Sequence, residues 1–414
     1  MNVGAGLVPT PGNHPSPTPS TGSGQARVVM TDFISRLLDL AIAIQQIPAP
    51  TFHEARRAEF LRDLFVAEGL ANVEIDAVGN AYGRWTTDNG RRRTNDGRRA
   101  PFDAAQGKPL VVSAHLDTVF PPETNLRVIR QPERITGAGI GDNAAGLAAL
   151  LGLAWLLRER GIHLPGDLWL VADVGEEGLG DLRVMKAVVE RFGATPKAYL
   201  VLEGTSLGQV YHRALGVQRY RITAQTAGGH AWTDHGQPSA VHVLTTLAAQ
   251  IAALPLPAEP RTTLNLGRIF GGTSVNTIAA EAFLELDLRS ESQKSLDELA
   301  NQIMQMHKSA NRQGVEVEME VLGQRPFGEM PADHPLVQLA ADCLRGQGLE
   351  PHLTIGSTDA NIPLSRGLPA ICLGVTTGGR THTVHEFIDV GPVMRGTEQL
   401  VRLVKRLSVI SDQY

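Results

Sequence analysis

Four apolar stretches typical of buried strands are each followed by acidic or histidine side chains, which are groups that bind metal ions or move protons. They are His115 and Asp117 after LVVSA, Glu176 and Glu177 after LWLVADV, Glu203 at the end of AYLVLE, and His382, His385 and Glu386 after PAICLGV. A further carboxylate, Asp142, lies in GAGIGDNAAG at the start of a long apolar helical pattern. Functional sites of open α/β sheets form outside the carboxyl ends of the strands, so we expect these groups to meet there.

Each of these residues alone has an ordinary explanation. A lone histidine at a strand end is more often structural than ligating, an aspartate before a helix is commonly its N-cap, and a Glu-Glu pair is usually a solvated loop. GAGIGD lacks the G-x-G-x-x-G spacing of a dinucleotide site. Together, however, carboxylates crowded at the end of a buried sheet repel one another, and divalent cations remove that conflict.

The available donor atoms are nitrogen and oxygen without sulfur, which suits zinc in a catalytic site, with cobalt or manganese as alternatives. Three carboxylates and a bridging hydroxide would neutralise two divalent ions, and a pair of ions about 3.5–4 Å apart is a standard hydrolytic arrangement. Because strand side chains alternate, His115 and Asp117 point to the same side, and Asp117 can hold the His115 ring. Of Glu176 and Glu177, one can bind metal while the other serves as general base.

The elements that position these residues alternate between strands and helices from residue 27 to 214 and again from 325 to 414. This alternation predicts an α/β fold with a mostly parallel sheet flanked by helices. Residues 215–324 instead follow the order βαββαβ, which predicts an inserted ferredoxin-like α+β domain. Two chain crossings, near residues 214 and 324, would join this domain to the rest, and relative motion of the two is the default expectation.

Composition excludes several classes of protein. A chain of 414 residues favours two domains, and its net charge of −5 gives no basic field for nucleic acid. The two cysteines, Cys343 and Cys372, indicate no disulfide framework and favour a reducing, cytoplasmic compartment. We find no apolar run approaching the roughly 20 residues that span a membrane.

Two segments are predicted to lie outside the folded core. Residues 1–26 are rich in Pro, Gly, Ser and Thr, so we expect a disordered tail, with helical periodicity from Thr31. The arginine-rich stretch 86–108 is polar and turn-rich, so we interpret it as a surface insertion whose arginines are solvated.

The motifs SAHLDTV, GAGIGDNAAG, GEEGLGDL, LEG, AGGHA, GSTDAN and HTVHE, in this order, resemble those of the dinuclear zinc exopeptidases and deacylases. That family includes peptidase T, aminoacylase, acetylornithine deacetylase and succinyl-diaminopimelate desuccinylase. The resemblance covers the chain from about residue 32 to the end, and GEEGLGDL and GSTDANIPLSRGLPAICLG are most similar to the peptidase T-like branch. The insertion at 86–108 has no counterpart in the family that we can place.

The resemblance implies a role for each residue of the set. His115 and Glu203 would bind one metal, Glu177 and His382 the other, and Asp142 would bridge them, commonly with a cis peptide bond after it. His382 rather than His385 is implied because the family's ligand lies four residues before the glutamate, here Glu386. Glu176 would be the general base.

The resemblance also implies roles for the inserted domain, as a lid and a surface for homodimer formation. His230 in AGGHA would stabilise the oxyanion, and in some members this histidine comes from the partner subunit. Asn276 and Arg289 match lid positions that touch substrate, although a solvated strand face explains Arg289 equally well.

We therefore expect a metal-dependent hydrolase that cleaves amide bonds of small peptides as an exopeptidase, most similar to an aminopeptidase of the peptidase T type. An N-acyl-amino-acid deacylase is the alternative, because both substrates present an amide to the same hydroxide. A binding protein that keeps the fold without the chemistry would have lost ligands, and all five are present.

Overall fold

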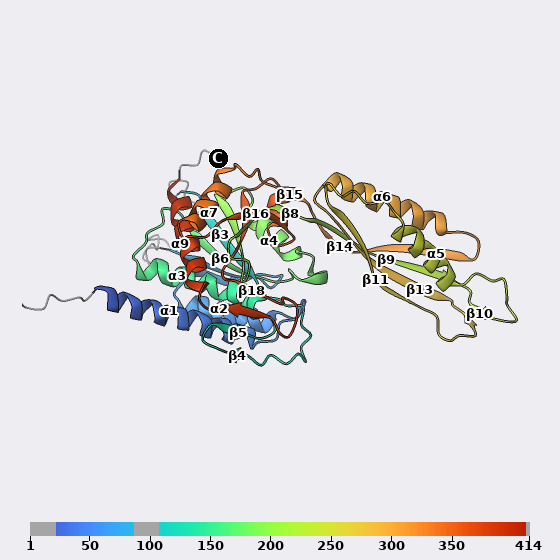
Figure 1. The fold of residues 1–414 in the computed structure, drawn as a ribbon, viewed down its shortest axis with the longest axis horizontal. Coiled ribbons are helices and arrows are strands. Elements are labelled where there is room, and N and C mark those ends of the chain that lie inside the picture. Colours follow the sequence, from blue (N-terminus) through green and yellow to red (C-terminus); the bar gives the residue numbers. More distant parts are fainter. Residues whose placement is uncertain (1–21, 87–106, 411–414) are drawn as a thin grey trace, which may run out of the picture.

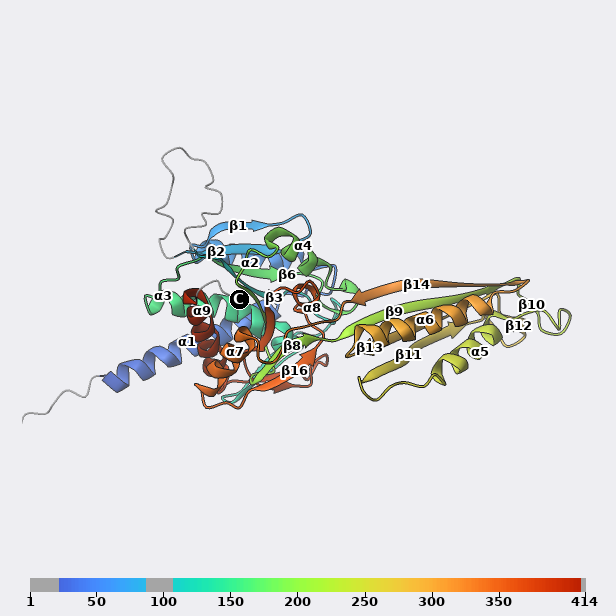
Figure 2. The ribbon, with the colours of Figure 1, turned by 90° about the horizontal axis from the view of Figure 1, so that it is seen from above.

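The computed structural model describes residues 22–86 and 107–410 of the chain, and it divides into two parts (Figure 1). The main part contains the segments before residue 215 and after residue 325, and the inserted part contains residues 216–325. The inserted part extends away from the main part along the longest axis of the molecule in both ribbon views (Figures 1 and 2).

The main part is built on a nine-stranded sheet in the order β1-β2-β6-β3-β7-β17-β8-β15, with β16 paired to β8. Its central strands β6, β3, β7 and β17 are mutually parallel, while β1, β2 and β15 join antiparallel at the edges. The strands are β1 (Ala71–Ile75), β2 (Ala81–Trp85), β3 (Leu110–His115), β6 (Leu168–Asp173), β7 (Ala198–Glu203), β8 (Gln209–Ala214), β15 (Gly328–Glu329), β16 (His352–Gly356) and β17 (Ala370–Gly374). The predicted α/β fold with a mostly parallel central sheet is confirmed.

Helices surround this sheet and complete a single apolar core. They are α1 (Gly22–Gln45), α2 (Ala55–Ala67), α3 (Gly146–Glu159), α4 (Arg183–Phe192), α7 (Pro335–Arg345), α8 (Asn361–Ser365) and α9 (Val393–Val409). The central helix α3 packs against β3, β7, α1 and α9, which is why its sequence GLAALLGLAWLLRE is apolar on every side.

One stretch of the described residues does reach membrane-spanning length, contrary to our expectation. Ile140–Glu159 is long and apolar enough by composition, and 94% of its apolar window is buried inside the protein. Segment 140–145 is kinked, with non-helical backbone angles at Asp142 and Asn143, and it leads directly into the buried helix α3.

The chain begins its first helix earlier than predicted. α1 starts at Gly22, so residues 22–26 belong to a helix and not to the predicted tail of 1–26. No proline lies between Pro19 and Pro48, so no helix-breaking proline interrupts the stretch from Gly22 to Gln45. The rest of that tail, and the insertion at 86–108 except for its ends, lie outside the described residues.

The inserted part contains a four-stranded antiparallel sheet in the order β11-β13-β9-β14. Its main elements are β9 (Gly216–Thr226), α5 (Ala240–Ala252), β11 (Thr262–Gly271), β13 (Glu281–Ser290), α6 (Gln293–Ala310) and β14 (Val315–Arg325). Both helices pack on the same side of the sheet (Figure 1). Strand β13 alternates buried leucines with more exposed charged residues, as a sheet with one covered face requires. This is the predicted βαββαβ order.

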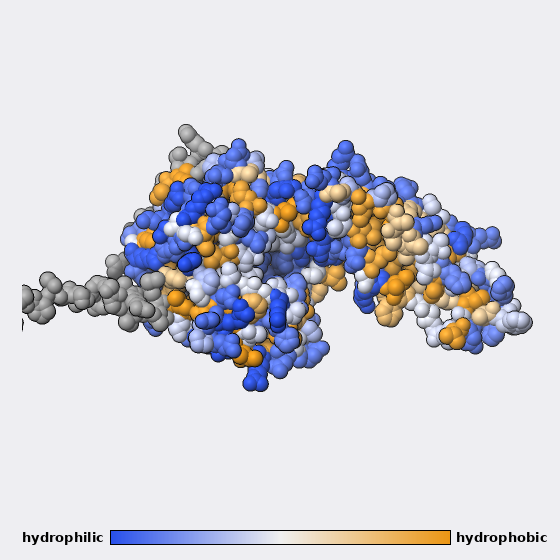
Figure 3. Space-filling view, viewed as in Figure 1, coloured by the Kyte–Doolittle hydropathy of each residue, from blue (hydrophilic) through white to orange (hydrophobic). Residues whose placement is uncertain are grey.

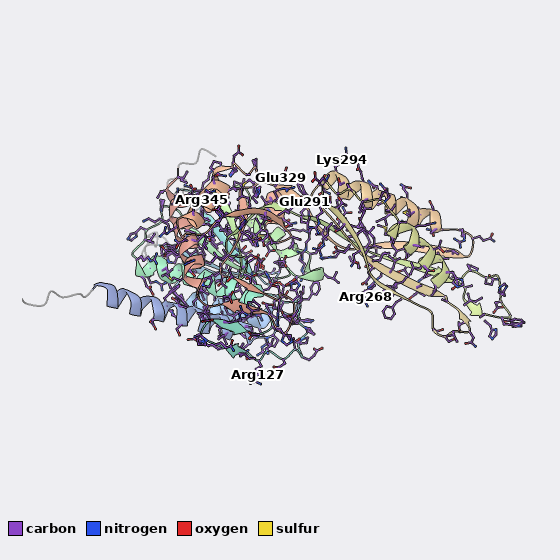
Figure 4. The ribbon with its side chains drawn as sticks, in the orientation of Figure 1. Arg127, Arg268, Glu291, Lys294, Glu329 and Arg345 are labelled. Atoms are coloured by element: carbon purple, nitrogen blue, oxygen red, sulfur yellow. The ribbon has the colours of Figure 1, made fainter. Side chains whose placement is uncertain are left out.

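Two neighbouring strands, β9 and β14, join the inserted part to the main part, with Val217 of β9 opposite Arg325 of β14. Arg213 lies beside this junction and pairs with Glu291 and Glu329, which are labelled in Figure 4. In the space-filling view a notch separates the two parts below the junction (Figure 3). We propose that the chain divides here into two domains.

Candidate active site

Five predicted ligands lie together at the carboxyl ends of the central strands. The two carboxylate oxygens of Asp142 point to different histidines: Oδ1 lies 2.9 Å from His115 Nε2, and Oδ2 lies 3.1 Å from His382 Nε2. Glu203 Oε2 lies 3.9 Å from His115 Nε2, and Glu177 Oε1 lies 3.1 Å from His382 Nε2. The arrangement therefore has two halves, each with one histidine and one glutamate, that share Asp142.

Three of these residues take their positions from neighbouring parallel strands. His115 is the last residue of β3, Glu203 is the last residue of β7, and Glu177 follows the end of β6 by a short loop. Only glycine fits at position 204, directly after Glu203, because the backbone of segment 140–145 lies against it. A Cβ at Gly204 would lie 1.9 Å from the Gly141 carbonyl oxygen. The tight contact between the two segments sets Asp142 next to Glu203.

Asp142 lies in the turn before α3, and the Asp142–Asn143 peptide bond is cis, as the family resemblance implied. The buried carboxylate of Glu386 accepts hydrogen bonds from the backbone N–H groups of Gly139 (3.3 Å), Gly141 (2.7 Å) and Asp142 (2.7 Å). Glu386 therefore fixes the backbone from which Asp142 projects.

His382 is supplied by a loop between two short strands, β18 (Gly378–Gly379) and β19 (Phe387–Asp389). These strands belong to a small separate sheet with β5 (Arg134–Thr136) and β4 (Ile129–Arg130). His382 has a φ of 66°, so the loop turns sharply at the ligand, and the neighbouring His385 is exposed. Glu386 ends the same loop, and it therefore ties the position of His382 to that of Asp142.

Asp117 lies behind His115, with Oδ1 3.4 Å from His115 Nδ1. Its carboxylate also accepts hydrogen bonds from the backbone N–H groups of Glu176 (3.0 Å) and Glu177 (2.9 Å) and from the Thr51 hydroxyl (2.8 Å). These donors and the adjacent His115 hold the pKa of Asp117 below its usual value despite complete burial. An ionised Asp117 orients the His115 ring and the loop that carries both glutamates.

Glu176 is 6% exposed, and an equally buried arginine contacts it. Arg325 donates a hydrogen bond from one Nη to Glu176 Oε1 at 2.8 Å and from the other to the Glu176 carbonyl oxygen. Burial raises the pKa of Glu176 to about 7, and the neighbouring charge of Arg325 opposes this shift. A carboxyl group that titrates near neutrality suits proton transfer.

The electrostatics of the cluster show that its carboxylates need positive charge. Hydrogen bonds to Asp142 and Glu177 raise the pKa of His382 to about 10, and burial raises the pKa of Glu203 far above its usual value. The donor atoms of His115, Asp142 and Glu177 lie within 4.8 Å of one another, a spacing at which one ion can contact all three. Imidazole nitrogens and carboxylate oxygens fit zinc, cobalt or manganese.

The cluster opens into a cavity of about 550 Å³ at the junction of the two parts. Asp142, Glu176, Glu177, Glu203 and His382 line one region of it. Three arginines from the inserted part also line it: Arg219, Arg289 and Arg325. The cavity therefore has room for a small substrate beside the cluster, with cationic groups available for an anionic end of that substrate.

Two predicted residues of the inserted part are not brought to the cluster. His230 is exposed in β10 (Gly229–His230), which pairs with β12 (Thr277–Ile278) beside Asn276. Figure 1 shows β10 at the end of the inserted part most distant from the main part. Asn276 lies beside His230, because its carbonyl oxygen accepts a hydrogen bond from Ala231 N at 3.0 Å. Of the three predicted lid residues, only Arg289 lines the cavity in this chain.

Sequence reasoning gave no role to three buried charged residues at the site. Asp173 of β6 pairs in register with His115, and both of its carboxylate oxygens are buried without a hydrogen-bond partner; Asp359 is equally buried. Burial raises the pKa of Asp173 to about 7 and that of Asp359 far above its usual value. Asp359 lies within GSTDAN, a motif that points to the site, whereas Asp173 and Arg325 lie in no motif that we recognised.

Comparison with known proteins agrees with this geometry. The sequence signature described as "Peptidase family M20/M25/M40" matches residues 111–406. The chain is 24% identical over 384 residues to the uncharacterized protein YqjE of Bacillus subtilis, covering 89% of this chain and 98% of that protein. It is 28% identical over 289 residues to a probable carboxypeptidase of Aspergillus terreus, covering 66% and 64% of the two chains.

Two solved structures share the fold. A tripeptidase of Staphylococcus aureus superposes with a TM-score of 0.74 at 22% identity, covering 91% of this chain and 98% of that one. The aminopeptidase PepT of Bacillus cereus superposes with a TM-score of 0.71 at 23% identity, covering 90% and 98%.

Proposed function

Because the chain belongs to peptidase family M20/M25/M40, we propose that it is a dinuclear metallohydrolase that cleaves amide bonds of small peptides as an exopeptidase. The observation that carries this proposal is the shared Asp142, whose two oxygens face two separate histidine–glutamate halves. His115 and Glu203 would hold one ion, and His382 and Glu177 the other. Zinc is the cation we propose, with cobalt or manganese as alternatives.

When bound, two divalent cations polarise a substrate carbonyl and make water a stronger nucleophile. The protein residues then supply orientation and proton transfer. Glu176 lines the cavity next to the ligand Glu177, so its carboxylate is placed to take the proton of the attacking water. The same carboxyl group returns that proton to the leaving amine. Asp117 keeps His115 in the tautomer that presents Nε2 to the ligand cluster.

The inserted part would contribute recognition and oxyanion stabilisation. Arg289 lines the cavity and is the group we propose for contact with a substrate carboxylate. His230 and Asn276 lie at the far end of the inserted part, which favours their supply from the second copy of a homodimer. Strand β11 supports this proposal, because it lies at the edge of its sheet with Ile269 and Phe270 exposed.

A substrate panel tests the proposed reaction. We expect the zinc-loaded protein to hydrolyse dipeptides and tripeptides faster than N-acetyl and N-succinyl amino acids. The reverse order would favour the N-acyl-amino-acid deacylase, which uses the same residues. Full metal occupancy without hydrolysis of any amide would instead indicate a non-catalytic binding protein.

Replacement of the proposed base separates chemistry from metal binding. Glu176→Ala should lower kcat by about 10²–10⁴-fold, the usual contribution of a general base, while the metal content stays close to that of the wild type. Metal lost together with activity would show that Glu176 is a ligand and that its proposed role is wrong.

A further inference from the structure

Arg325 is the last residue of β14, at the point where the chain leaves the inserted part, and it is 6% exposed. Its guanidinium binds the side chain and the backbone carbonyl of Glu176, and one Nη also lies 3.1 Å from the Ser357 hydroxyl and 3.4 Å from the Ser357 carbonyl oxygen. A planar guanidinium with several fixed donors therefore joins the inserted part to the proposed base.

The hydrogen bond from Arg325 leaves the two oxygens of Glu176 in different situations. Oε1 is held at 2.8 Å, and no hydrogen bond to Oε2 occurs among the described residues. Because Glu176 lines the cavity, the second oxygen is available to a reacting water.

A second arginine, from the neighbouring strand β9, donates a hydrogen bond to the loop that follows Glu176 and Glu177. Arg219 of β9 donates a hydrogen bond to the carbonyl oxygen of Gly178 at 2.6 Å, and its Nε binds Asp287 of β13 at 2.9 Å. Both strands that carry the inserted part thus contact the short loop that contains Glu176 and Glu177. If the inserted part rotates, the hydrogen bonds of Arg325 and Arg219 must shift or break, and the loop that carries Glu176 would shift with them.

We propose that Arg325 is a positioning residue that holds Glu176 in its reactive orientation and makes that orientation depend on how the inserted part is seated. The proposal rests on the proposed function, because it concerns the base of that reaction. It adds a role for the inserted part, which would control the base as well as contact the substrate.

The test compares Arg325→Ala with Arg325→Lys, and with Arg221→Ala as a matched control. Arg221 lies in β9, the strand paired with β14, but its ion-pair and ring partners, Glu285 and Phe283, both belong to the inserted part. With the dipeptide substrate of the panel, Arg325→Ala should lower kcat by about 100-fold with KM and metal content unchanged, because only the transition state loses an interaction. Arg221→Ala should keep wild-type kcat, and the lysine variant should lie between.

Chemical rescue distinguishes positioning from general damage. Millimolar guanidinium chloride should restore part of the kcat of Arg325→Ala, since the ion can occupy the vacated space, and should leave Glu176→Ala inactive. Hydrogen exchange at the Glu176 and Glu177 amides, which donate to Asp117, should be faster in Arg325→Ala than in Arg221→Ala. This measurement does not require activity.

Several outcomes would overturn the inference. These are an unchanged kcat in both Arg325 variants, a loss of activity that parallels metal loss, or an absence of guanidinium rescue. If Arg325→Ala does not fold, the same readouts on Arg325→Lys decide the matter. If the wild-type protein hydrolyses no amide, the proposed function is overturned. If the wild type is active but the Arg325 variants do not behave as expected, only the proposal about Arg325 is overturned.

Discussion

The main part and the inserted part both carry many charged side chains, but they pair them differently. Two central acids on the open face of the inserted sheet have arginine partners: Glu285 binds Arg221 and Arg268, and Asp287 binds Arg219 and Arg289. Arg268 projects from the edge of this sheet in Figure 4. These pairs are partly exposed, so each is expected to contribute little to stability.

The ligand carboxylates of the main part have no such partners. Among the described residues, the ion pairs of Asp142, Glu177 and Glu203 are to histidines, and no lysine or arginine neutralises them. Buried charge without protein counter-charge is costly, so it persists where a bound ion supplies the balance. The comparison teaches that buried acids without arginine or lysine partners are the better guide to a proposed metal site than the number of charged residues in a region.

The largest effect should follow from removing the shared carboxylate. Asp142→Ala should abolish hydrolysis and lower zinc affinity by more than about 100-fold, because even groups that only support metal ligands contribute about 10–100-fold. Metal titration by calorimetry and activity assays would measure both effects. An acid of the inserted part provides the contrast: Glu285→Ala should retain full metal binding, and loss of zinc there would break the distinction between the two parts.

A smaller effect is expected at the distal end of the inserted part. His230→Ala should lower kcat by about 10²–10³-fold, the usual contribution of one oxyanion donor, without loss of metal. If His230 acts across a dimer, a mixture of His230→Ala and Glu176→Ala chains should recover activity after exchange of subunits. Failure of mixed dimers to recover activity would place His230 in the same subunit as the metals it serves, or outside the reaction.

The two hydrophobic cores provide a comparison of stability. Leu150 of α3 and Leu244 of α5 are fully buried in separate cores, so truncation of either to alanine should cost about 2–5 kcal/mol. The measurement is urea-induced unfolding followed by tryptophan fluorescence and circular dichroism. Leu150→Ala should destabilise the main part. Leu244→Ala should destabilise the inserted part and should leave zinc binding unchanged. Val66→Ala on the surface of α2 should change neither midpoint.

The smallest effect concerns pH. The proposed base must be ionised, and burial raises the pKa of Glu176 to about 7, so kcat/KM should fall as the pH drops through that value. The fall should approach about tenfold per pH unit, as for a single titrating group. A pH–rate profile between pH 5 and pH 9 that stays flat on the acidic side would contradict this assignment. Metal content measured at each pH separates protonation of Glu176 from loss of the ions, because ligand protonation also weakens metal binding.

The ligand cluster could be predicted from the sequence because it follows from short-range rules. His115, Glu177 and Glu203 each follow an apolar strand, and parallel strands necessarily bring their carboxyl ends to one edge. The roles of these residues, and the choice of His382 over His385, came from the family motifs. The structure brings His382 and not His385 into contact with Asp142 and Glu177, and the roles of the residues stay predictions.

The remaining features depend on contacts that no local pattern encodes. Arg325 is one arginine at the end of a strand, and only the packing of β14 against the Glu176 loop gives it a role. The buried carboxyl group of Asp173 was missed because a polar residue in a strand gives no signal of burial without the fold. Asp359 lies in a turn within a recognised motif, but the motif alone does not show that its side chain is buried. The distant position of His230 depends on how the inserted part is oriented, which periodicity cannot predict.

The pairing of Val217 with Arg325 has an evolutionary consequence. Opposed residues of antiparallel strands have Cα atoms only about 5 Å apart, so the inserted part begins and ends at nearly the same point. A gene segment with such ends can be acquired, lost or replaced while the parent sheet keeps its register. Exchange of the whole inserted part is therefore compatible with the main sheet. If Arg325 positions Glu176 as we propose, a replacement would also have to supply an arginine at this point.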